Sequence, residues 1–500
     1  MTIYGDYSRA RIGWFFGLSG WQLGTLTVAV LPVAVAVSRS AWASAGLFLV
    51  LWALLAVVVA VPVRGRSVTG WLAATLATAA GGLMGWTRFR ARATRGAVRD
   101  PAQADLPGVL TSIEVHEGPP YGPTYRRVAL VQNHAARTWA LTAAVVHPGL
   151  GLAEASERDG YGRGLSQLLD VQVKTELVSE VILQVRTVPE DGAERADWMA
   201  RHRQPGAPAA ARVINDTLAA TLTAASVRTE SFVTIVVPES RLSKVAKEYG
   251  GGVSGRARAL HAVAAETESH LRAAVGASSV EWLTSAELAT ACRTGFAPGD
   301  RASLVEALAA HAAGDQVNTE VPWSMAGPSG ADPAPRHYSH DAWNSVSSTL
   351  KLPVKGAAIG ALAPILSTQQ DGERRALMVC YPIVPAGQAA RRSTNSEFAA
   401  DLGEELNARA RRKVSTRSRD EVDKVRRIES KLARGNSLTE PYAVATVTVP
   451  KTVSAAEAGR RLDAAIRRCG FAPMRLDLAQ DVSFAATVVP LGVSLTRRSG

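Results

Sequence analysis

Residues 14–37 read WFFGLSGWQLGTLTVAVLPVAVAV, and residues 40–63 read SAWASAGLFLVLWALLAVVVAVPV. Neither stretch contains a charged residue, and little more than Arg39 separates them. A helix of roughly 20 apolar residues is long enough to cross a hydrocarbon core about 30 Å thick. Two such stretches joined so tightly predict an antiparallel transmembrane helical hairpin, which we assign to residues 1–66.

A third uncharged stretch, residues 67–87, is dominated by Ala, Gly, Ser and Thr. Its few large apolar residues fall mostly on one face of a helix. This pattern favours a helix that lies in the membrane interface or packs on the hairpin. A third membrane span is the alternative. We assign residues 67–104 to this apolar helix and a basic linker.

Arginines and tryptophans flank the three apolar stretches and predict how they sit in a bilayer. The basic residues at the ends of the stretches are Arg9, Arg11, Arg64, Arg66, Arg88 and Arg90. The aromatic residues near the ends are Trp14, Trp21, Trp42, Trp71 and Trp86. Two spans leave all six arginines on one side, whereas three spans would translocate the last group. The positive-inside rule therefore predicts a multi-pass protein of the cell membrane with cytoplasmic termini and a cytoplasmic soluble region.

The formal charge of +12 is concentrated at the membrane end. Residues 1–100 contain ten arginines, no lysine and two aspartates, a net charge of +8. Basic residues beside apolar helices usually set orientation and contact anionic lipid, so membrane lipid is one expected partner. The charge does not establish direct nucleic-acid binding by the rest of the chain.

From about residue 105 the pattern changes to strands and amphipathic helices. Three consecutive strands without helices between them favour an α+β fold with mixed or antiparallel sheets over a doubly wound sheet. Predicted strands cover residues 109–116, 125–132, 138–146, 180–188, 229–237, 375–384, 441–450 and 482–490. Predicted helices cover residues 162–177, 207–226, 254–275, 284–296 and 453–469. Thr284 and Glu287 form a capping-box pattern at the start of one of them.

A stretch rich in Gly, Pro, Ser, Ala and Asp, residues 313–340, predicts a linker. It would separate a first α+β domain, residues 105–312, from a second, residues 341–500. The second domain contains a very polar helical stretch at about 395–434. Its charged part, residues 407–435, mixes acids with arginines and lysines, which favours a solvated helix over a nucleic-acid or partner-docking helix.

No motif identifies a catalytic, cofactor or metal site. Residues 250–257 (GGGVSGRA) keep the glycine spacing of a phosphate-binding loop but lack its Lys and Ser or Thr, so a loop capping the next helix is expected. The pair His337 and His340, followed by Asp341, predicts a surface turn. The cysteines Cys292, Cys380 and Cys469 are far apart, which is typical neither of a disulfide framework nor of a zinc site. We therefore expect a non-catalytic protein without a cofactor.

The N-terminus carries a resemblance to a known family. Tyr4, Gly5 and Gly13, within YGDYSRARIG, resemble the start of PrgI-like two-span membrane proteins of type IV, conjugative secretion systems, of which fused forms are common in actinobacteria. The soluble region resembles the non-ATPase N-terminal half of TraC- and TrbE-type ATPases. In layout the chain is also similar to the type VII secretion component EccE.

These resemblances imply a non-catalytic inner-membrane scaffold subunit. They also imply two kinds of partner, a separate secretion or conjugation ATPase and other membrane channel subunits. An EccE-like type VII component is one alternative function. A membrane-bound enzyme, a transporter or a sensor with an unrecognised site is another.

Overall fold

The computed structural model describes residues 20–496 except 61, 64–65, 86, 152, 190–191, 226, 352–356, 371, 386, 388, 390–426, 428–429 and 432–436. The chain forms two compact units. The larger unit includes Thr87–Ala386 and Ser437–Gly500, and the smaller includes Asp6–Trp86 and Gly387–Asn436. The polar stretch predicted at about 395–434 lies almost entirely outside the described residues.

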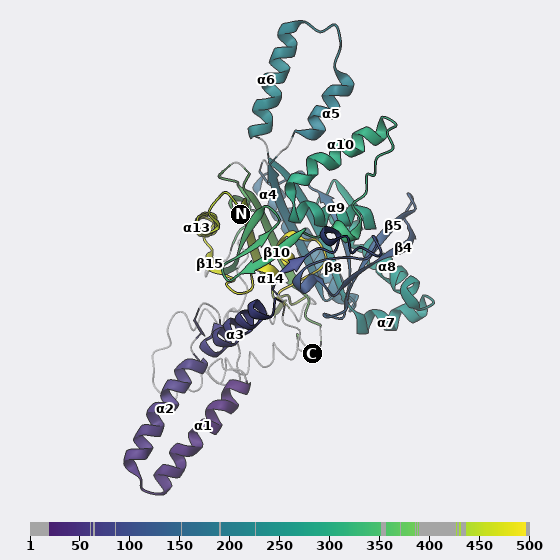
Figure 1. Ribbon diagram of the computed structural model, residues 1–500. Helices are drawn as coiled ribbons and strands as arrows, with labels where there is room; N and C mark the ends of the chain where they lie inside the picture. Colours follow the sequence, from purple (N-terminus) through teal and green to yellow (C-terminus); the bar gives the residue numbers. More distant parts are fainter. Residues whose placement is uncertain are drawn as a thin grey trace. The chain divides into compact units, whose positions relative to one another are not determined.

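The described part of the smaller unit consists of three apolar helices and a short two-stranded ladder (Figure 1). The helices are α1 (Gly20–Ser38), α2 (Trp42–Ala60) and α3 (Val68–Met84), and the ladder pairs β1 (Pro62–Val63) with β2 (Arg66–Ser67). Helices α1 and α2 run antiparallel, and the indole Nε1 of Trp52 donates to the carbonyl of Leu26 at 2.9 Å. Only residues 39–41 separate α1 from α2, so the tight connection predicted between the two apolar stretches is present.

Helix α2 is long and apolar enough, by length and composition, to cross a membrane over Trp42–Val59. Only 11 % of this segment is buried, and apolar side chains are exposed around it. The described apolar parts of α1 and α3 are shorter, at Gly24–Ser38 and Ala74–Met84. The prediction of a membrane-length apolar helix is confirmed for α2, whereas the span predicted over residues 14–37 stays a prediction.

The larger unit is built on one 13-stranded antiparallel sheet. Its strand order is β3-β10-β11-β12-β14-β13-β7-β8-β6-β5-β4, with β15 paired to β12 and β9 paired to β6. The strands are β3 (Phe89–Arg90), β4 (Ile113–Tyr121), β5 (Arg126–Asn133), β6 (Thr138–Val146), β7 (Glu180–Pro189), β8 (Val227–Pro238), β9 (Ser279–Trp282), β10 (Gly330–Ala334), β11 (His337–His340), β12 (Trp343–Lys351), β13 (Arg374–Pro382), β14 (Tyr442–Pro450) and β15 (Ala472–Arg475). The predicted α+β class is confirmed, and strands from residues 105–312 and 341–500 share this sheet.

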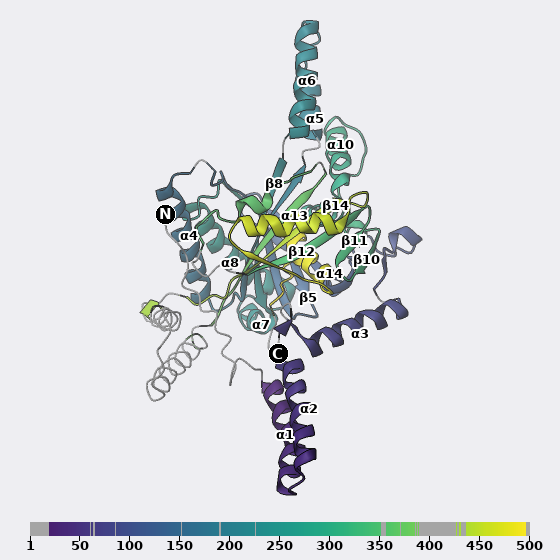
Figure 2. The ribbon, with the colours of Figure 1, turned by 90° about the vertical axis from the view of Figure 1, so that its left-hand side faces the viewer.

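Helices cover both faces of the sheet (Figure 2). The helices of this unit are α4 (Ala155–Lys174), α5 (Ala193–His202), α6 (Ala209–Ala225), α7 (Glu239–Glu248), α8 (Gly252–Ala273), α9 (Ser285–Phe296), α10 (Arg301–Ala312), α13 (Ala455–Arg468) and α14 (Gln480–Val488). Successive strand residues point to opposite faces. Val233 and Ile235 of β8 pack with α4, α7 and α8, whereas Phe232 and Val236 pack with α9 and α14. Helix α13 covers β12 and β14.

Most predicted elements are present with shifted ends, but residues 482–490 and 313–340 differ from their predictions. Residues 482–490 were predicted as a strand, but α14 is a helix whose Phe484 is fully buried against the sheet. A short apolar run does not distinguish a buried helix from a strand. Residues 313–340 were predicted as a linker, but they contain β10 and β11, which join the sheet. The sequence prediction missed α5, α7, α10, β12 and the short strands β3, β9 and β15.

Two local predictions are confirmed. The Thr284 side chain accepts from the backbone N–H of Glu287 at 3.4 Å, and the Glu287 carboxylate accepts from the N–H of Thr284 at 2.9 Å. This is the predicted capping box at the start of α9. In the glycine-rich stretch, Gly250, Gly251 and Gly252 all have positive φ angles and connect α7 to α8. These angles explain why three glycines occur in that turn.

Candidate docking site: the α5–α6 hairpin and its ionic base

A helical hairpin is inserted between two paired strands of the sheet. Strands β7 and β8 pair antiparallel up to Pro189 and Val227, and the chain between them forms α5 and α6. Figures 1 and 2 both show α5 and α6 projecting beyond the end of the sheet, with α10 beside the base of α5. The sequence predicted α6 at 207–226. It missed α5, whose ten residues AERADWMARH carry the apolar Trp198 and Met199 among charged residues.

Helix α6 exposes its apolar face. Val213 and Ile214 are each 64 % exposed, and Leu218 is 51 % exposed. Because each helical residue turns about 100°, Ile214 and Leu218 lie on one face and Asp216 lies on the other. The Asp216 carboxylate accepts from Nη2 of Arg203 at 3.1 Å, in the loop that leads from α5. Asp216 therefore contacts the loop after α5, while Ile214 and Leu218 on the opposite side of α6 are turned to solvent.

Polar contacts join the two helices. Besides the contact to Asp216, Nη1 of Arg195 donates to the carbonyl of Ala219 at 3.1 Å. On α5, the Trp198 ring stacks on His202 with centroids 4.3 Å apart, yet Trp198 remains 57 % exposed. The hairpin thus carries one exposed Trp on α5 and exposed aliphatic residues on α6, residue types that occur at the centres of protein–protein interfaces.

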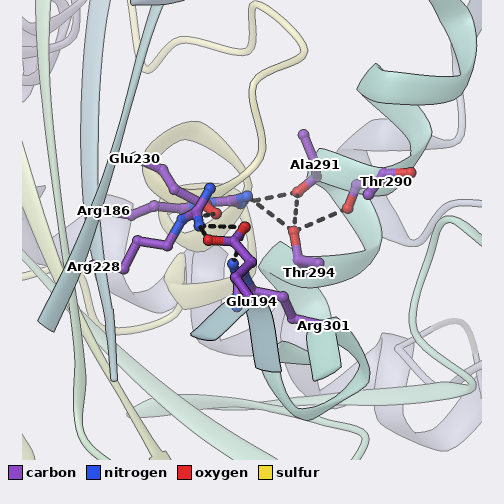
Figure 3. A network of polar contacts seen from close by, with 8 residues as sticks. All are labelled: Arg186, Glu194, Arg228, Glu230, Thr290, Ala291, Thr294 and Arg301. Atoms are coloured by element: carbon purple, nitrogen blue, oxygen red, sulfur yellow. Dashed lines mark hydrogen bonds and ion pairs between the residues drawn. The ribbon is translucent and has the colours of Figure 1, made fainter. Parts of the chain in front are cut away.

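The base of the hairpin is held by ion pairs (Figure 3). Glu194, in the first turn of α5, accepts from Nη1 of Arg228 on β8 through both carboxylate oxygens, at 2.7 and 2.8 Å. Nη2 of Arg301 on α10 donates to the same carboxylate at 2.8 Å. One carboxylate therefore joins α5 to both β8 and α10. Arg301 is only 7 % exposed, so its contact is largely shielded from solvent.

Arg186, which is buried, forms a second set of polar contacts close to the Glu194 carboxylate (Figure 3). Nε of Arg186 on β7 donates to Glu230 on β8 at 2.5 Å, and its Nη1 donates to the carbonyls of Ala291 and Val488 at 2.9 and 3.1 Å. Its Nη2 donates to the hydroxyl of Thr294 at 3.0 Å. Arg186 therefore ties the strands that bear the hairpin to α9 and to the end of α14.

Electrostatics favour the charged form of Glu230. Burial alone would raise the pKa of its carboxyl group. The charges of Arg186, Arg374 and Arg228, together with the Arg186 hydrogen bond, outweigh burial and lower the pKa below its usual value. Arg374 is buried, and the cost of burial and the neighbouring Arg186 lower its pKa to about 9. Three arginines thus surround one partly buried carboxylate.

A band of polar side chains crosses the sheet face beneath α14. Thr142 donates to the carbonyl of Pro490 at 2.9 Å, and the amide of Gln184 donates to the carbonyl of Ala486 at 2.7 Å. Gln184 and Arg186 thus hydrogen-bond carbonyls in the last turn of α14, where the helix itself supplies no partner. Thr142 bonds the carbonyl of Pro490, just after the helix. The band therefore fixes α14 on the sheet.

The residues predicted as a surface turn, 337–341, are part of this interior instead. His340 is fully buried in β11, where its ring lies 2.9 Å from both the carbonyl of Phe296 and the hydroxyl of Ser345. The carbonyl can only accept, so Nδ1 carries the proton and Ser345 donates to Nε2. Ser345 in turn lies 2.7 Å from the hydroxyl of Thr448. The turn prediction was wrong because the sequence did not reveal these partners.

This histidine–hydroxyl chain is sealed from solvent. Burial, with smaller effects of Arg374 and Lys451, outweighs the Phe296 carbonyl and lowers the pKa of His340 to about 3. A neutral imidazole with both nitrogens occupied holds the core together. Ser345 and His340 both have no solvent exposure, so no substrate reaches them in this conformation.

Several sequence-predicted site residues lie outside the description or on the surface. The residues not described are Tyr4, Gly5, Arg9, Arg11, Gly13, Trp14, Arg64 and Trp86. Trp21 and Arg66 are placed only as backbone, in α1 and β2. Trp42 is 71 % exposed and Trp71 is partly buried. Arg88 and Arg90 are exposed, Arg88 just before the edge strand β3 and Arg90 within it. Their predicted role at a membrane interface stays a prediction.

Within the described residues, no group of three or more His, Cys, Asp or Glu side chains is arranged to hold a metal ion. A cavity of about 250 Å³ is lined by Ala155, Arg158, Asp159 and Ile359. The cavity lies at the start of α4, and its lining includes none of the residues that form the ionic base of the hairpin. The exposed hairpin and its ionic base are therefore the strongest candidate for a functional site.

Comparison with known proteins does not assign the chain. No protein-family model matches it, and no curated protein matches it. The function is therefore argued from the residues and their geometry.

Proposed function

We propose that this protein is a membrane-anchored scaffold that docks partner proteins through its soluble unit. The observation that carries the proposal is the α5–α6 hairpin, which presents Trp198, Ile214 and Leu218 to solvent while ion pairs fix its base. Exposed apolar residues on a helical hairpin whose base is held by ion pairs are suited to binding another protein.

The apolar helices support membrane attachment. Helix α2 is apolar around its whole circumference, with Leu47, Val50 and Leu54 each more than half exposed. A helix that is hydrophobic all round requires a protein core or a bilayer around it. We propose that α1 and α2 form the predicted transmembrane hairpin, with both termini and the soluble unit in the cytoplasm.

The N-terminal resemblance refines this proposal. In a type IV, PrgI-like setting, the scaffold would dock a separate secretion or conjugation ATPase together with polytopic channel subunits. In a type VII, EccE-like setting, the role would be the same and the partners would differ. We propose the type IV setting because Tyr4, Gly5 and Gly13 occur in the pattern of that family.

A pull-down of the tagged full chain from native membranes in mild detergent, followed by mass spectrometry, tests the proposal. Recovery of a conjugation-type ATPase with polytopic subunits is the expected result. Recovery of type VII components would keep the scaffold role and change the system. Recovery of the chain without a stoichiometric partner would contradict the scaffold role and favour the enzyme or sensor alternatives.

A further inference from the structure

Helix α13 packs on the sheet through one side and leaves a basic side in solvent (Figure 2). Its buried residues Leu462 and Ile466 belong to the apolar cluster that includes β12 and β14. Because each helical residue turns about 100°, Arg460 and Arg467 lie within about 20° of one another and nearly opposite Leu462. Arg460, Arg467 and Arg468, which we call the α13 arginines, are all exposed. The apolar side of α13 thus packs on the sheet, and the exposed side is basic.

The other arginines of this region are paired with acids, whereas the α13 arginines are not. Arg461 contacts Glu373 at 3.0 Å and Glu457 at 3.2 Å, and Arg475 contacts Asp463 at 2.9 Å. Among the residues that the structure describes, none forms an ion pair with an α13 arginine. Three exposed guanidinium groups on one helix therefore remain available to an anionic partner.

Positive charge in the larger unit is concentrated in two segments. Residues 88–99, which contain β3, have five arginines and no acidic residue. Residues 451–475, which contain α13 and β15, have six basic and two acidic residues, a net charge of +4. The remaining residues of 87–386 and 437–500 have 27 basic and 33 acidic residues, a net charge of −6. An anionic surface would therefore attract these two segments and repel the rest of the unit.

The first of these segments directly follows the apolar helices. Only residues 85–88 connect the end of α3 to the start of β3. Since each residue extends a chain by at most about 3.6 Å, this connection spans about 18 Å at most. A short tether raises the effective concentration of the bilayer surface around the soluble unit. This favours the bilayer over a nucleic acid or an acidic protein, which must first associate from solution.

We propose that the α13 arginines bind the anionic headgroups of the bilayer that holds the apolar helices. A guanidinium group suits this role, because it donates two parallel hydrogen bonds to one phosphate. Each basic residue close to an anionic leaflet strengthens attachment about fivefold, so three strengthen it about a hundredfold. This inference rests on the membrane attachment proposed above and is independent of the scaffold role.

The test uses the full chain in lipid nanodiscs, with its three native cysteines replaced and one fluorophore attached. Ala456→Cys places the fluorophore on the exposed side of α13, one turn before Arg460. Thr124→Cys places it in the exposed turn between β4 and β5, outside both basic segments. The discs carry spin-labelled headgroups as quencher, with either about one-third phosphatidylglycerol or phosphatidylcholine alone.

Quenching at position 456 is expected to be at least about threefold stronger in the anionic discs and to vanish in about 1 M salt, which screens the attraction. Quenching at position 124 is expected to be the same in both kinds of disc. Equal quenching of position 456 in the two kinds of disc, or at low and high salt, would overturn the inference.

A matched pair of triple variants isolates the charge of α13. Replacing all three α13 arginines with Gln is expected to reduce quenching at position 456 in anionic discs to the level in neutral discs. The control removes three exposed positive charges elsewhere, as Arg212→Gln, Lys244→Gln and Lys247→Gln, and is expected to leave most of the quenching intact. Equal effects of the two triple variants would contradict a contact made by α13. Equal thermal unfolding midpoints would show that both variants fold.

The outcomes separate this inference from the proposed membrane attachment. If the chain does not enter the discs, the attachment itself fails. If the chain enters them without lipid-dependent quenching, the attachment stands and α13 does not contact the bilayer. Binding of a nucleic acid or an acidic protein that depends on the α13 arginines, without such quenching, would also overturn the inference and assign this side of α13 to that partner.

Discussion

Glu194 and Arg228 form a two-oxygen contact, with Nη1 of Arg228 at 2.7 and 2.8 Å from the two carboxylate oxygens. The contact joins the first turn of α5 to strand β8, close to where the hairpin leaves the sheet. Arg301 shares the carboxylate, so one acidic residue contacts both β8 and α10 at the base of the hairpin. This relationship makes the hairpin a separately testable part of the fold.

Replacing Glu194 with Gln is expected to loosen the hairpin without unfolding the sheet. Arg228 and Glu194 are both partly exposed, so solvent screens the pair and global stability should fall by less than about 1 kcal/mol. Hydrogen exchange of the backbone amides of α5 and α6 should become faster, while exchange in β7 and β8 stays unchanged. Unchanged exchange in α5 would show that Glu194 does not fix the hairpin.

Replacing Arg186 with Met is expected to destabilise the whole soluble unit. The change removes the main partner of Glu230, whose carboxylate is partly buried. A fully buried charge that loses its partner typically costs about 3–5 kcal/mol, so a loss toward the lower end of that range is expected. The measurement is the free energy of unfolding in urea, with Arg212→Met as an exposed control that should change little. Adding Glu230→Gln to Arg186→Met should recover part of the loss, because it removes the unpaired charge. A loss below about 1 kcal/mol for Arg186→Met alone would contradict the role of the network.

Protonation of His340 is expected to destabilise the fold in acid. Its folded-state pKa is about 3, below the usual 6.5, so the unfolded state binds more protons between these values. Stability from this residue is present above about pH 6.5 and falls by up to about 1.4 kcal/mol per unit as pH drops toward 3. His340→Gln should make the thermal unfolding midpoint depend less on pH between pH 6.5 and 4. His311→Gln, at an exposed position, should leave that dependence unchanged. Parallel profiles for wild type and His340→Gln would contradict this assignment.

The predicted topology places the residues after α3 in the cytoplasm. With Cys292, Cys380 and Cys469 replaced, Ala102→Cys introduces one thiol at an exposed position. An impermeant thiol reagent should label this cysteine in opened cells and leave it unlabelled in intact cells. Labelling in intact cells would instead support a third span through residues 67–87.

The sequence predicts the class of the fold well because its signals are local. Periodicity placed β6 at its observed bounds, and the pair Thr284 and Glu287 marked the start of α9. The run VSFAATVVP was misassigned to a strand because β-branched and aromatic residues also suit a buried helix. In α14 these residues pack against the sheet through Phe484 and Val488, a contact that only the tertiary structure supplies.

The candidate site was much less predictable than the fold. Glu194, Arg228 and Arg301 are far apart in sequence, and no spacing rule joins them. Arg186 and His340 are polar residues within strands, and only their partners across the sheet explain their burial. The one available signal was the amphipathic pattern of residues 207–226, which predicted α6 but not that its apolar face is exposed.

The central claim, a membrane-anchored scaffold that works in a larger assembly, is tested most directly by the mass of the particle that contains the chain. Native membranes would be dispersed into lipid nanodiscs, and particles captured through a tag on the full chain would be weighed by mass photometry. The chain alone has a mass of 52.7 kDa. The account predicts lipid-containing particles several times heavier than one chain plus its disc, with partner proteins present in fixed ratio. Recovery of the chain only as a single copy, or only in the fraction without lipid, would contradict it.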